Sequence, residues 1–285
     1  MSLIPLFFVF LLVLGLPIAF VLGISAIIVM IIQGVTPLNA LPEYMFVGID
    51  SFPLMAIPFF VLTGEIMRVS GLSSRLVKLA QAFVGRIPGA LAQVNILTSI
   101  FFAGITGSAC ADTAAIGSLL IPAMEKEGYS PEYSAAVTGA SSCIGPIIPP
   151  SIILVVYGIS ASVSVSALLI AGIIPGILMG VCLGILAYFQ AIKYNFPCIQ
   201  EKYSLRELLF AVKKAIPALL MPIIIVGGIL SGVFTPTEAA CVAVVYSTLL
   251  GFATKKIKVK QIPSICINSA ITTSVVLFII STAKV

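Results

Sequence analysis

The sequence predicts an all-α polytopic membrane protein, and three observations lead to that prediction. Of the 285 residues, 60% are hydrophobic and 9% are charged, whereas a soluble domain carries about 25% charged residues. The apolar runs are continuous, whereas the strands of a membrane β-barrel alternate apolar and polar residues. The 15 Lys and Arg residues gather between these runs, a pattern that orients membrane helices and does not suggest nucleic-acid binding.

The first apolar run covers residues 3–32. As one helix it would be about 45 Å long, more than the roughly 30 Å of a bilayer's hydrocarbon core. We therefore expect Gly15 and Pro17 either to kink the run or to split it. It is also too long for the apolar core of a cleavable signal. Residues 33–44 are expected to form a loop.

The next apolar segment, residues 48–67, is interrupted by Pro53 and Pro58 and favours a re-entrant hairpin over a spanning helix. A basic, amphipathic stretch follows at residues 68–86 and is expected on the cytoplasmic side. The later apolar runs predict helices, some of them broken, over residues 88–122, 133–157, 165–190, 215–231, 238–253 and 262–284. Polar loops are expected at residues 125–132, 193–214 and 255–260.

The three basic clusters at residues 68–86, 193–214 and 255–260 also predict the orientation of the chain. If all three lie inside, the N-terminus lies outside, provided that the first run crosses once and that the segment around Pro53 is re-entrant. The number of crossings then requires that one proline-broken segment does not cross as a simple helix. The sequence leaves open which segment that is.

Several chemistries are excluded by composition, and no enzyme is predicted. The chain has no histidine, which removes Ser-His and Cys-His nucleophile pairs, histidine-ligated zinc and histidine-ligated haem. It also has no phosphate-binding loop of the G-x-x-x-x-G-K-[ST] type. The six cysteines form no C-x-x-C pair, so neither a disulfide framework nor a metal site is expected.

A polar box interrupts the apolar run at residues 104–122. A carboxylate near the bilayer centre costs about 3 kcal/mol on insertion scales, so an aspartate there points to a function. The predicted ligands, whose oxygens suit a hard monovalent cation, are Thr106, Gly107, Ser108, Asp112 and Thr113. The alternative is close helix packing through small residues, which Asp112 fits poorly.

Three further breaks could line a cavity, because half-helix N-termini present N–H donors to anions. They lie at residues 50–53, considered together with Glu65, at residues 145–151 and at residues 235–238. Each has a structural alternative: Asp50 as an N-cap, a plain proline kink, and a helix cap by Thr235 or Thr237 with Glu238 in the first turn.

Two weaker patterns are an internal resemblance between two segments and a row of polar residues on one helix. Gly48-x-x-Ser51-Phe52-Pro53 resembles the segment at residues 232–236, and paired interruptions of this kind occur in transporters built from inverted repeats. A polar stripe on one helix is expected to form helix–helix hydrogen bonds. Its members are Ser134, Thr138, Ser141 and Ser142.

These blocks together resemble the large membrane subunit, of the DctM type, of tripartite ATP-independent periplasmic (TRAP) transporters. The blocks occur in the family's order over essentially the whole chain: F-P-L-M-A-I-P-F-F-V-L-T-G-E-I-M at 52–67, G-S-A-C-A-D-T-A-A-I-G at 107–117, I-P-A-M-E-K-E-G-Y at 121–129, G-P-I-I-P-P-S-I at 145–152 and G-V-F-T-P-T-E-A-A at 232–240.

The resemblance implies an elevator-type, sodium-driven secondary transporter of the bacterial inner membrane that imports organic acids such as C4-dicarboxylates or sialic acid. It implies two partners, a small four-helix membrane subunit and a periplasmic substrate-binding protein. It implies two re-entrant hairpins related by an inverted repeat. Substrate contacts are expected from Ser51, Pro53, Pro149, Pro150, Ser151, Thr235 and Thr237. Sodium contacts are expected from Ser51, Thr106, Gly107, Ser108, Asp112 and Thr113.

The resemblance also suggests a division of the chain. Residues 1–44 would be an N-terminal scaffold region, 45–158 a first-repeat transport region, 159–231 scaffold helices with a basic connector, and 232–285 the start of a second repeat. Family members continue further, so an incomplete inverted repeat and a C-terminally truncated chain are expected. The alternatives to a transporter are a cation channel with Asp112 as its selectivity carboxylate, an inactive permease fragment and a membrane scaffold.

Overall fold

A computed structural model describes residues 3–34, 37–84, 87–196 and 205–285 of the chain. Within these ranges the regular structure is helical, with α-helices α1 to α14 and three short 3-10 helices. Five helical segments are long and apolar enough to cross a membrane. The prediction of an all-α polytopic protein is confirmed.

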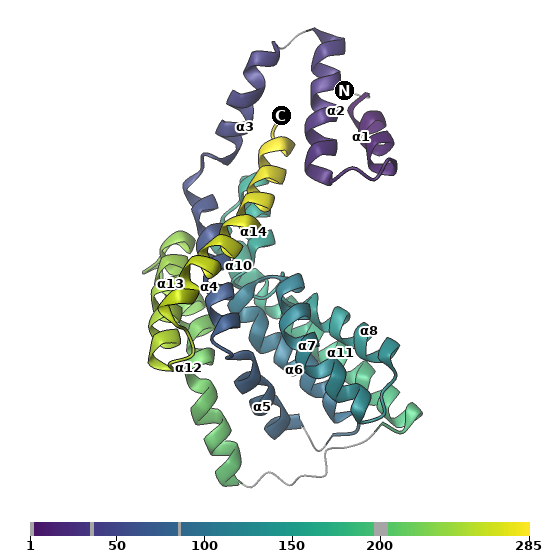
Figure 1. The fold of residues 1–285 in the computed structure, drawn as a ribbon, viewed down its shortest axis with the longest axis vertical. Coiled ribbons are helices and arrows are strands. Elements are labelled where there is room, and N and C mark those ends of the chain that lie inside the picture. The colour runs from purple at the N-terminus through teal and green to yellow at the C-terminus, as the bar shows by residue number, and fades with distance from the viewer. Residues whose placement is uncertain (1–2, 35–36, 85–86, 197–204) are drawn as a thin grey trace.

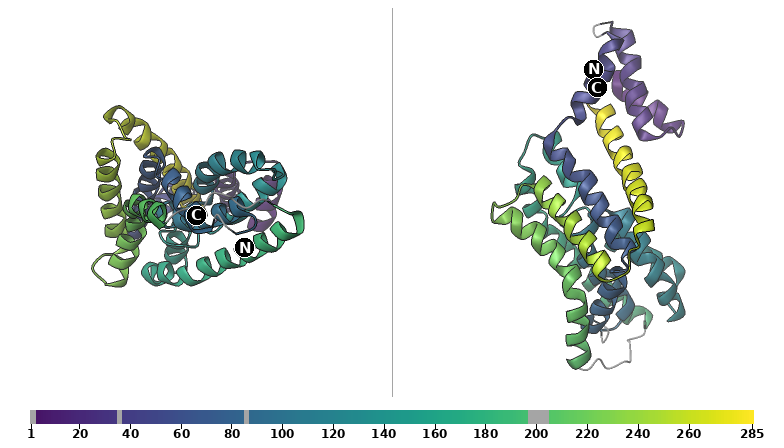
Figure 2. Two further views of the ribbon diagram at one scale, coloured as in Figure 1. Left: turned by 90° about the horizontal axis from the view of Figure 1, so that it is seen from below. Right: turned by 60° about the vertical axis from the view of Figure 1, so that its left-hand side comes forward.

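The first apolar run is split rather than kinked. It forms α1 (Leu3–Val13) and α2 (Ile18–Gln33), with Gly15 at φ +78° between them. The two helices pack against each other, and α2 also packs against the C-terminal helix. Figure 2 shows this pair set apart at one end of the molecule.

The loop expected at residues 33–44 is shorter than predicted. A 3-10 turn, η1 (Leu38–Ala40), leads directly into α3 (Leu41–Ile49). Pro42 lies in the first turn of α3, where a missing N–H costs nothing, so this proline starts a helix instead of marking a loop.

The chain breaks at residues 50–51 as the prolines predict, but it does not fold back there. Helix η2 (Phe52–Met55) and α4 (Ala56–Val69) continue past α3, and both α3 and α4 pack along α14 (Ile262–Ala283) (Figure 1). The re-entrant hairpin predicted at residues 48–67 is therefore wrong in this structure. Tertiary contact with α14 replaces contact between the two arms.

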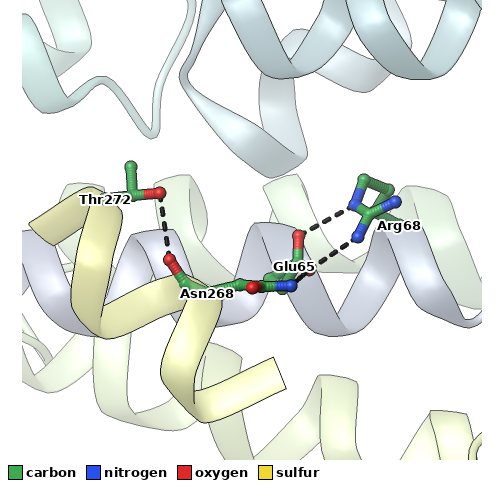
Figure 3. Close-up of polar contacts among 4 residues, drawn as sticks. All are labelled: Glu65, Arg68, Asn268 and Thr272. Carbon is green, nitrogen blue, oxygen red and sulfur yellow. Dashed lines mark hydrogen bonds and ion pairs between the residues drawn. The ribbon is translucent and has the colours of Figure 1, made fainter. Parts of the chain in front are cut away.

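Two hydrogen bonds at opposite ends of α14 hold this arrangement. Ser281 Oγ donates to the Met45 carbonyl of α3 over 2.8 Å, and Asn268 Nδ2 donates to Glu65 of α4 over 3.1 Å. Glu65 also pairs with Arg68, with oxygen–nitrogen distances of 2.6 and 2.8 Å (Figure 3). Glu65 is thus engaged between helices, away from the break with which the sequence associated it.

At the second predicted position two helices do pack as a pair, but both are long enough to cross a membrane, so they are not the short arms of a re-entrant hairpin. Helix α12 (Leu205–Leu230) turns at residues 231–235 and packs against α13 (Pro236–Ala253), which in turn packs extensively against α4. Helix α12 begins at Leu205, whereas the predicted helix began at residue 215. Residues 205–214 are therefore helical and not part of a loop. The remainder of that expected connector, residues 197–204, lies outside the described ranges.

On the other side of α4 lies a bundle built from α6 (Ala90–Thr106), α7 (Ala109–Lys126) and α8 (Pro131–Ser142), which pack against one another (Figure 1). Helix α11 (Ile173–Tyr194) covers α6 and α8. The amphipathic α5 (Ser73–Val84) packs against α6 and α12. Arg86, the last basic residue of the expected amphipathic stretch, lies outside the described residues.

The two remaining helices connect the bundle to α12 and to η2. They are α9 (Ile152–Ser160) and α10 (Val165–Ala171). The run expected as one helix at residues 165–190 is divided at Gly172 into α10 and α11, but Gly172 keeps a right-handed backbone and the two form one candidate span, Val165–Tyr194. A Cβ at Gly172 would lie 2.2 Å from the Ile147 carbonyl oxygen, so glycine allows the chain to pack closely there.

Candidate functional site

The polar box contains a true helix break. Helix α6 ends at Thr106 and α7 begins at Ala109, with Gly107 in the left-handed region at φ +61°. Ser108 is the N-cap of α7, and its Oγ accepts a hydrogen bond from the Ala111 N–H over 3.4 Å. The broken helix predicted from the glycine and the polar residues is confirmed.

The second predicted break packs directly on the first. Gly145 lies against the backbone of Ser108 and Ala109, with a virtual Cβ 3.3 Å from the Ser108 carbonyl carbon. A Cβ at Gly107 would lie only 2.1 Å from the Pro150 carbonyl oxygen. The chain is therefore drawn together at two interruptions that are distant in sequence.

Serine closes the second interruption as it does the first. Ser151 is the N-cap of α9, where its Oγ accepts from the Leu154 N–H over 3.1 Å and donates to the Pro146 carbonyl. Pro149 and Pro150 are both buried beside it. The predicted residues Gly107, Ser108, Pro149, Pro150 and Ser151 thus share one buried junction between α6, α7 and α9.

Asp112 is the unusual group at this junction. It lies in the first turn of α7 and is 0% exposed, and neither carboxylate oxygen has a hydrogen-bond partner among the described residues. The hydroxyls of Ser142 and Ser99 lie near the carboxyl group, but neither forms a hydrogen bond of standard geometry with it. An ionised carboxylate buried without a partner costs several kcal/mol, so this site is incomplete without a cation or a proton.

Backbone oxygens lie at the same interruption. Gly104, Ile105 and Thr106 are buried, and their carbonyls accept no backbone hydrogen bond from any described residue. The last carbonyls of a helix carry the negative end of its dipole. Unpaired carbonyls at the end of α6 and an unpaired carboxylate at the start of α7 thus flank the same two-residue gap. Carbonyl and carboxylate oxygens are hard ligands, of the kind that sodium prefers.

A ladder of hydrogen bonds supports the junction from one side. Asn95 Nδ2 donates to Thr138 Oγ1 over 2.7 Å and Asn95 Oδ1 accepts from Ser141 Oγ over 3.1 Å. Ser99 Oγ donates to Ser141 Oγ over 3.1 Å. Two of the four residues of the polar stripe, Thr138 and Ser141, bond between helices as expected and lock α8 onto α6 beside Asp112. Ser134 instead donates to the nearby Ser130 carbonyl, and Ser142 Oγ has no hydrogen-bond partner among the described residues.

Two predicted sodium contacts, Thr113 and Ser51, lie elsewhere, and the Thr106 side chain packs toward α4 although its carbonyl ends α6. The Thr113 side chain is exposed on the outer face of α7. Thr106 is packed against Gly64 of α4, whose virtual Cβ lies 3.4 Å from the Thr106 Cα. Ser51 is 13 residues before Gly64, which is about 20 Å along a helix, so the structure does not bring Ser51 to the junction.

Ser51 instead lines a second site, a pocket of about 410 Å³ between η2, the end of α9 and the start of α13. This pocket also brings together Pro53, Thr235 and Thr237, which the sequence had grouped with it as substrate contacts. Thr237 Oγ1 donates to the Phe52 carbonyl over 3.2 Å. The two segments that resemble each other in sequence, around Pro53 and Pro236, therefore lie side by side.

The cap and pocket interpretations of residues 235–238 hold at once. Thr235 Oγ1 accepts from the Glu238 N–H over 3.3 Å, while Glu238 Oε2 accepts from the Thr235 N–H over 2.8 Å. The capped N-terminus of α13 lines the pocket through Thr235, Pro236 and Thr237. Asp50, by contrast, is exposed and follows the last turn of α3, so the predicted N-cap role is wrong.

Ser99, which faces Asp112 from α6, was not among the residues predicted for the site. A signal was present: Asn95, Ser99 and Thr106 recur at spacings of four and seven residues on one face of an otherwise apolar helix. Ser142 was noticed only as part of the stripe on α8.

Interrupted helices packed on each other, the five candidate spans found among the described residues and an unpaired buried carboxylate together define a multi-pass α-helical membrane protein. More particularly, the chain belongs to the family described as tripartite ATP-independent periplasmic transporter, DctM component, whose profile matches residues 5–285.

Relatives of this family are similar over most of the chain. The protein YgiK of Salmonella typhimurium is 44% identical over 96% of this chain and 63% of its own length. The sialic acid TRAP transporter large permease protein SiaM of Vibrio cholerae is 40% identical over 83% of this chain and 55% of its own length. The 2,3-diketo-L-gulonate TRAP transporter large permease protein YiaN of Escherichia coli is 39% identical over 95% and 64%. The chain therefore spans less than two thirds of the length of these relatives.

Proposed function

We propose that the chain acts as the large permease subunit of a sodium-coupled importer of small organic acids in the bacterial inner membrane. Its proposed partners are a small four-helix membrane subunit and a periplasmic binding protein that delivers the acid. Two similar permeases are named for sialic acid and 2,3-diketo-L-gulonate, which are both carboxylic acids. The observation that carries the sodium coupling is Asp112, buried with both oxygens unpaired.

In this proposal sodium is a transported ion and binds at the interruption between α6 and α7. Asp112 supplies the negative charge, and the carbonyls that end α6 supply neutral oxygens. The ion would neutralise the buried carboxylate and hold the two half-helices in one arrangement. The close contacts of Gly107 with Pro150 then pass that ordering to the second interruption.

The substrate carboxylate is proposed to bind at the 410 Å³ pocket. The N-terminus of α13 offers the positive end of its dipole, and Ser51 offers a hydroxyl. Thr235 and Thr237 would contribute by exchanging their present hydrogen bonds to Glu238 and to the Phe52 carbonyl for bonds to the substrate. Helix α4 connects the two sites, because η2 lines the pocket and Gly64 contacts Thr106. Ion and acid would then favour each other's binding by the same factor, as coupling requires. Movement of the loaded unit against a scaffold completes the proposed transport cycle.

Uptake into membrane vesicles tests this function. The chain is produced together with a small TRAP subunit, and labelled sialic acid, C4-dicarboxylates, sugar acids and keto acids are supplied on a binding protein. We expect accumulation of one class of acid under an inward sodium gradient and none under a potassium gradient. Uptake independent of sodium would contradict the coupling, and absence of uptake would contradict transport by this chain. Ion conductance without binding protein would favour the channel alternative.

A further inference from the structure

A second large pocket, of about 750 Å³, lies away from both proposed transport sites. It is bounded by α5, the first turns of α12 and the connection between α13 and α14, and α5 packs directly against α12. Its basic lining residues are Arg75, Lys78, Lys214 and Lys256. These residues come from three separate parts of the sequence, so their gathering is a property of the fold.

The charge of this basic pocket is strongly unbalanced. Glu207 is the one carboxylate among the lining residues, so four cations and one anion leave a net charge of +3. None of the four basic side chains forms an ion pair with a described residue. Like charges converging in a concave surface with low-dielectric walls produce a strong positive potential, which an anion would relieve.

Apolar surface adjoins these charges. Phe210 lines the pocket and is 58% exposed, and Leu209 beside it is 69% exposed. Lys214 Nζ lies 4.1 Å from the centre of the Phe210 ring, so the ammonium group is held at the boundary between the charged and apolar surfaces. The segment Arg206–Leu230, which is long and apolar enough to cross a membrane, begins here. A ligand at this place would meet cations at one end and the bilayer at the other.

We propose that the basic pocket binds the phosphate-bearing headgroup of an anionic membrane lipid. Arg75 presents a planar fork of donors suited to phosphate oxygens, and the lysines supply compact charges around it. The acyl chains would follow α12 beyond Lys214, along the exposed Ile216 and Leu220. The bound lipid would join α5, α12 and the α13–α14 connection, so it would stabilise the fold as well as anchor it. This inference does not depend on the proposed transport function.

The test is lipid binding by the purified chain in a neutral detergent. Phosphatidylglycerol, phosphatidylcholine and inorganic phosphate are added separately, and the melting temperature and the apparent dissociation constant are measured. The variant Lys78→Gln/Lys214→Gln is compared with Lys126→Gln/Lys193→Gln, which removes two exposed charges elsewhere. Circular dichroism and size exclusion establish that each variant is folded.

We expect phosphatidylglycerol to raise the melting temperature of the native chain and phosphatidylcholine to leave it unchanged. The affinity of Lys78→Gln/Lys214→Gln for phosphatidylglycerol should fall about thirtyfold, equivalent to about 2 kcal/mol for two basic side chains. The control variant should bind like the native chain. Equal binding of both lipids, or equal loss in both variants, would overturn the proposal. An effect of inorganic phosphate as large as that of the lipid would assign the pocket to a soluble phosphate.

Discussion

At the scale of single residues, Gly107 is the position in the junction that should tolerate a side chain least. It combines a left-handed backbone at φ +61° with a Cβ position 2.1 Å from the Pro150 carbonyl oxygen. Gly34 is a matched control, because it ends α2 at φ +63° and has nothing within 4 Å of its Cβ position. Gly34→Ala should cost only the backbone term of about 1–2 kcal/mol. Gly107→Ala should cost a further 1–3 kcal/mol, roughly, because the facing loop must move. Equal losses in unfolding free energy would show that the two breaks are not in contact.

At the scale of helices, the pairing of α6 with α8 depends on Asn95. Removal of one interhelical hydrogen bond in a membrane protein costs about 0.6 kcal/mol on average. In a double-mutant cycle, Asn95→Ala and Thr138→Val should therefore show a coupling energy of about that size. Asn95→Ala combined with Ser118→Ala, an exposed site on α7, should show none. Unfolding by denaturing detergent measures both cycles, and a coupling energy near zero for the first would contradict the ladder.

The same scale shows what the sequence could and could not predict. Breaks at Pro17, Gly107 and residues 145–151 follow from local backbone chemistry, and they were predicted. The path of α3 and α4 was not predicted, because it depends on contacts with α14, which lies more than 200 residues later in the chain. Ser281 and Asn268 of α14 make these contacts. The separation of Ser51 from Asp112 was missed for the same reason. Residue types identified both sites, but only tertiary packing decides which members lie together.

At the scale of the whole molecule, the basic clusters predict the orientation in the membrane. The start of α3 lies toward one end of the molecule and the end of α11 toward the other (Figure 1). In a chain freed of its native cysteines, Asn39→Cys in η1 should react with an impermeant thiol reagent in intact spheroplasts. Lys193→Cys in the last turn of α11 should react only after permeabilisation, because positive residues remain inside. The reverse labelling pattern would contradict the orientation.

The central claim is that sodium binds at Asp112, and a melting-temperature measurement on the purified chain tests it most directly. A ligand that binds only the folded state stabilises it by RT ln(1 + [L]/Kd). Sodium chloride should therefore raise the melting temperature relative to an equal concentration of potassium chloride, and Asp112→Asn should abolish that difference. Glu125→Gln, which alters an exposed carboxylate on the same helix, should keep it. A sodium-specific shift of equal size in Asp112→Asn, or no shift in the native chain, would contradict the claim.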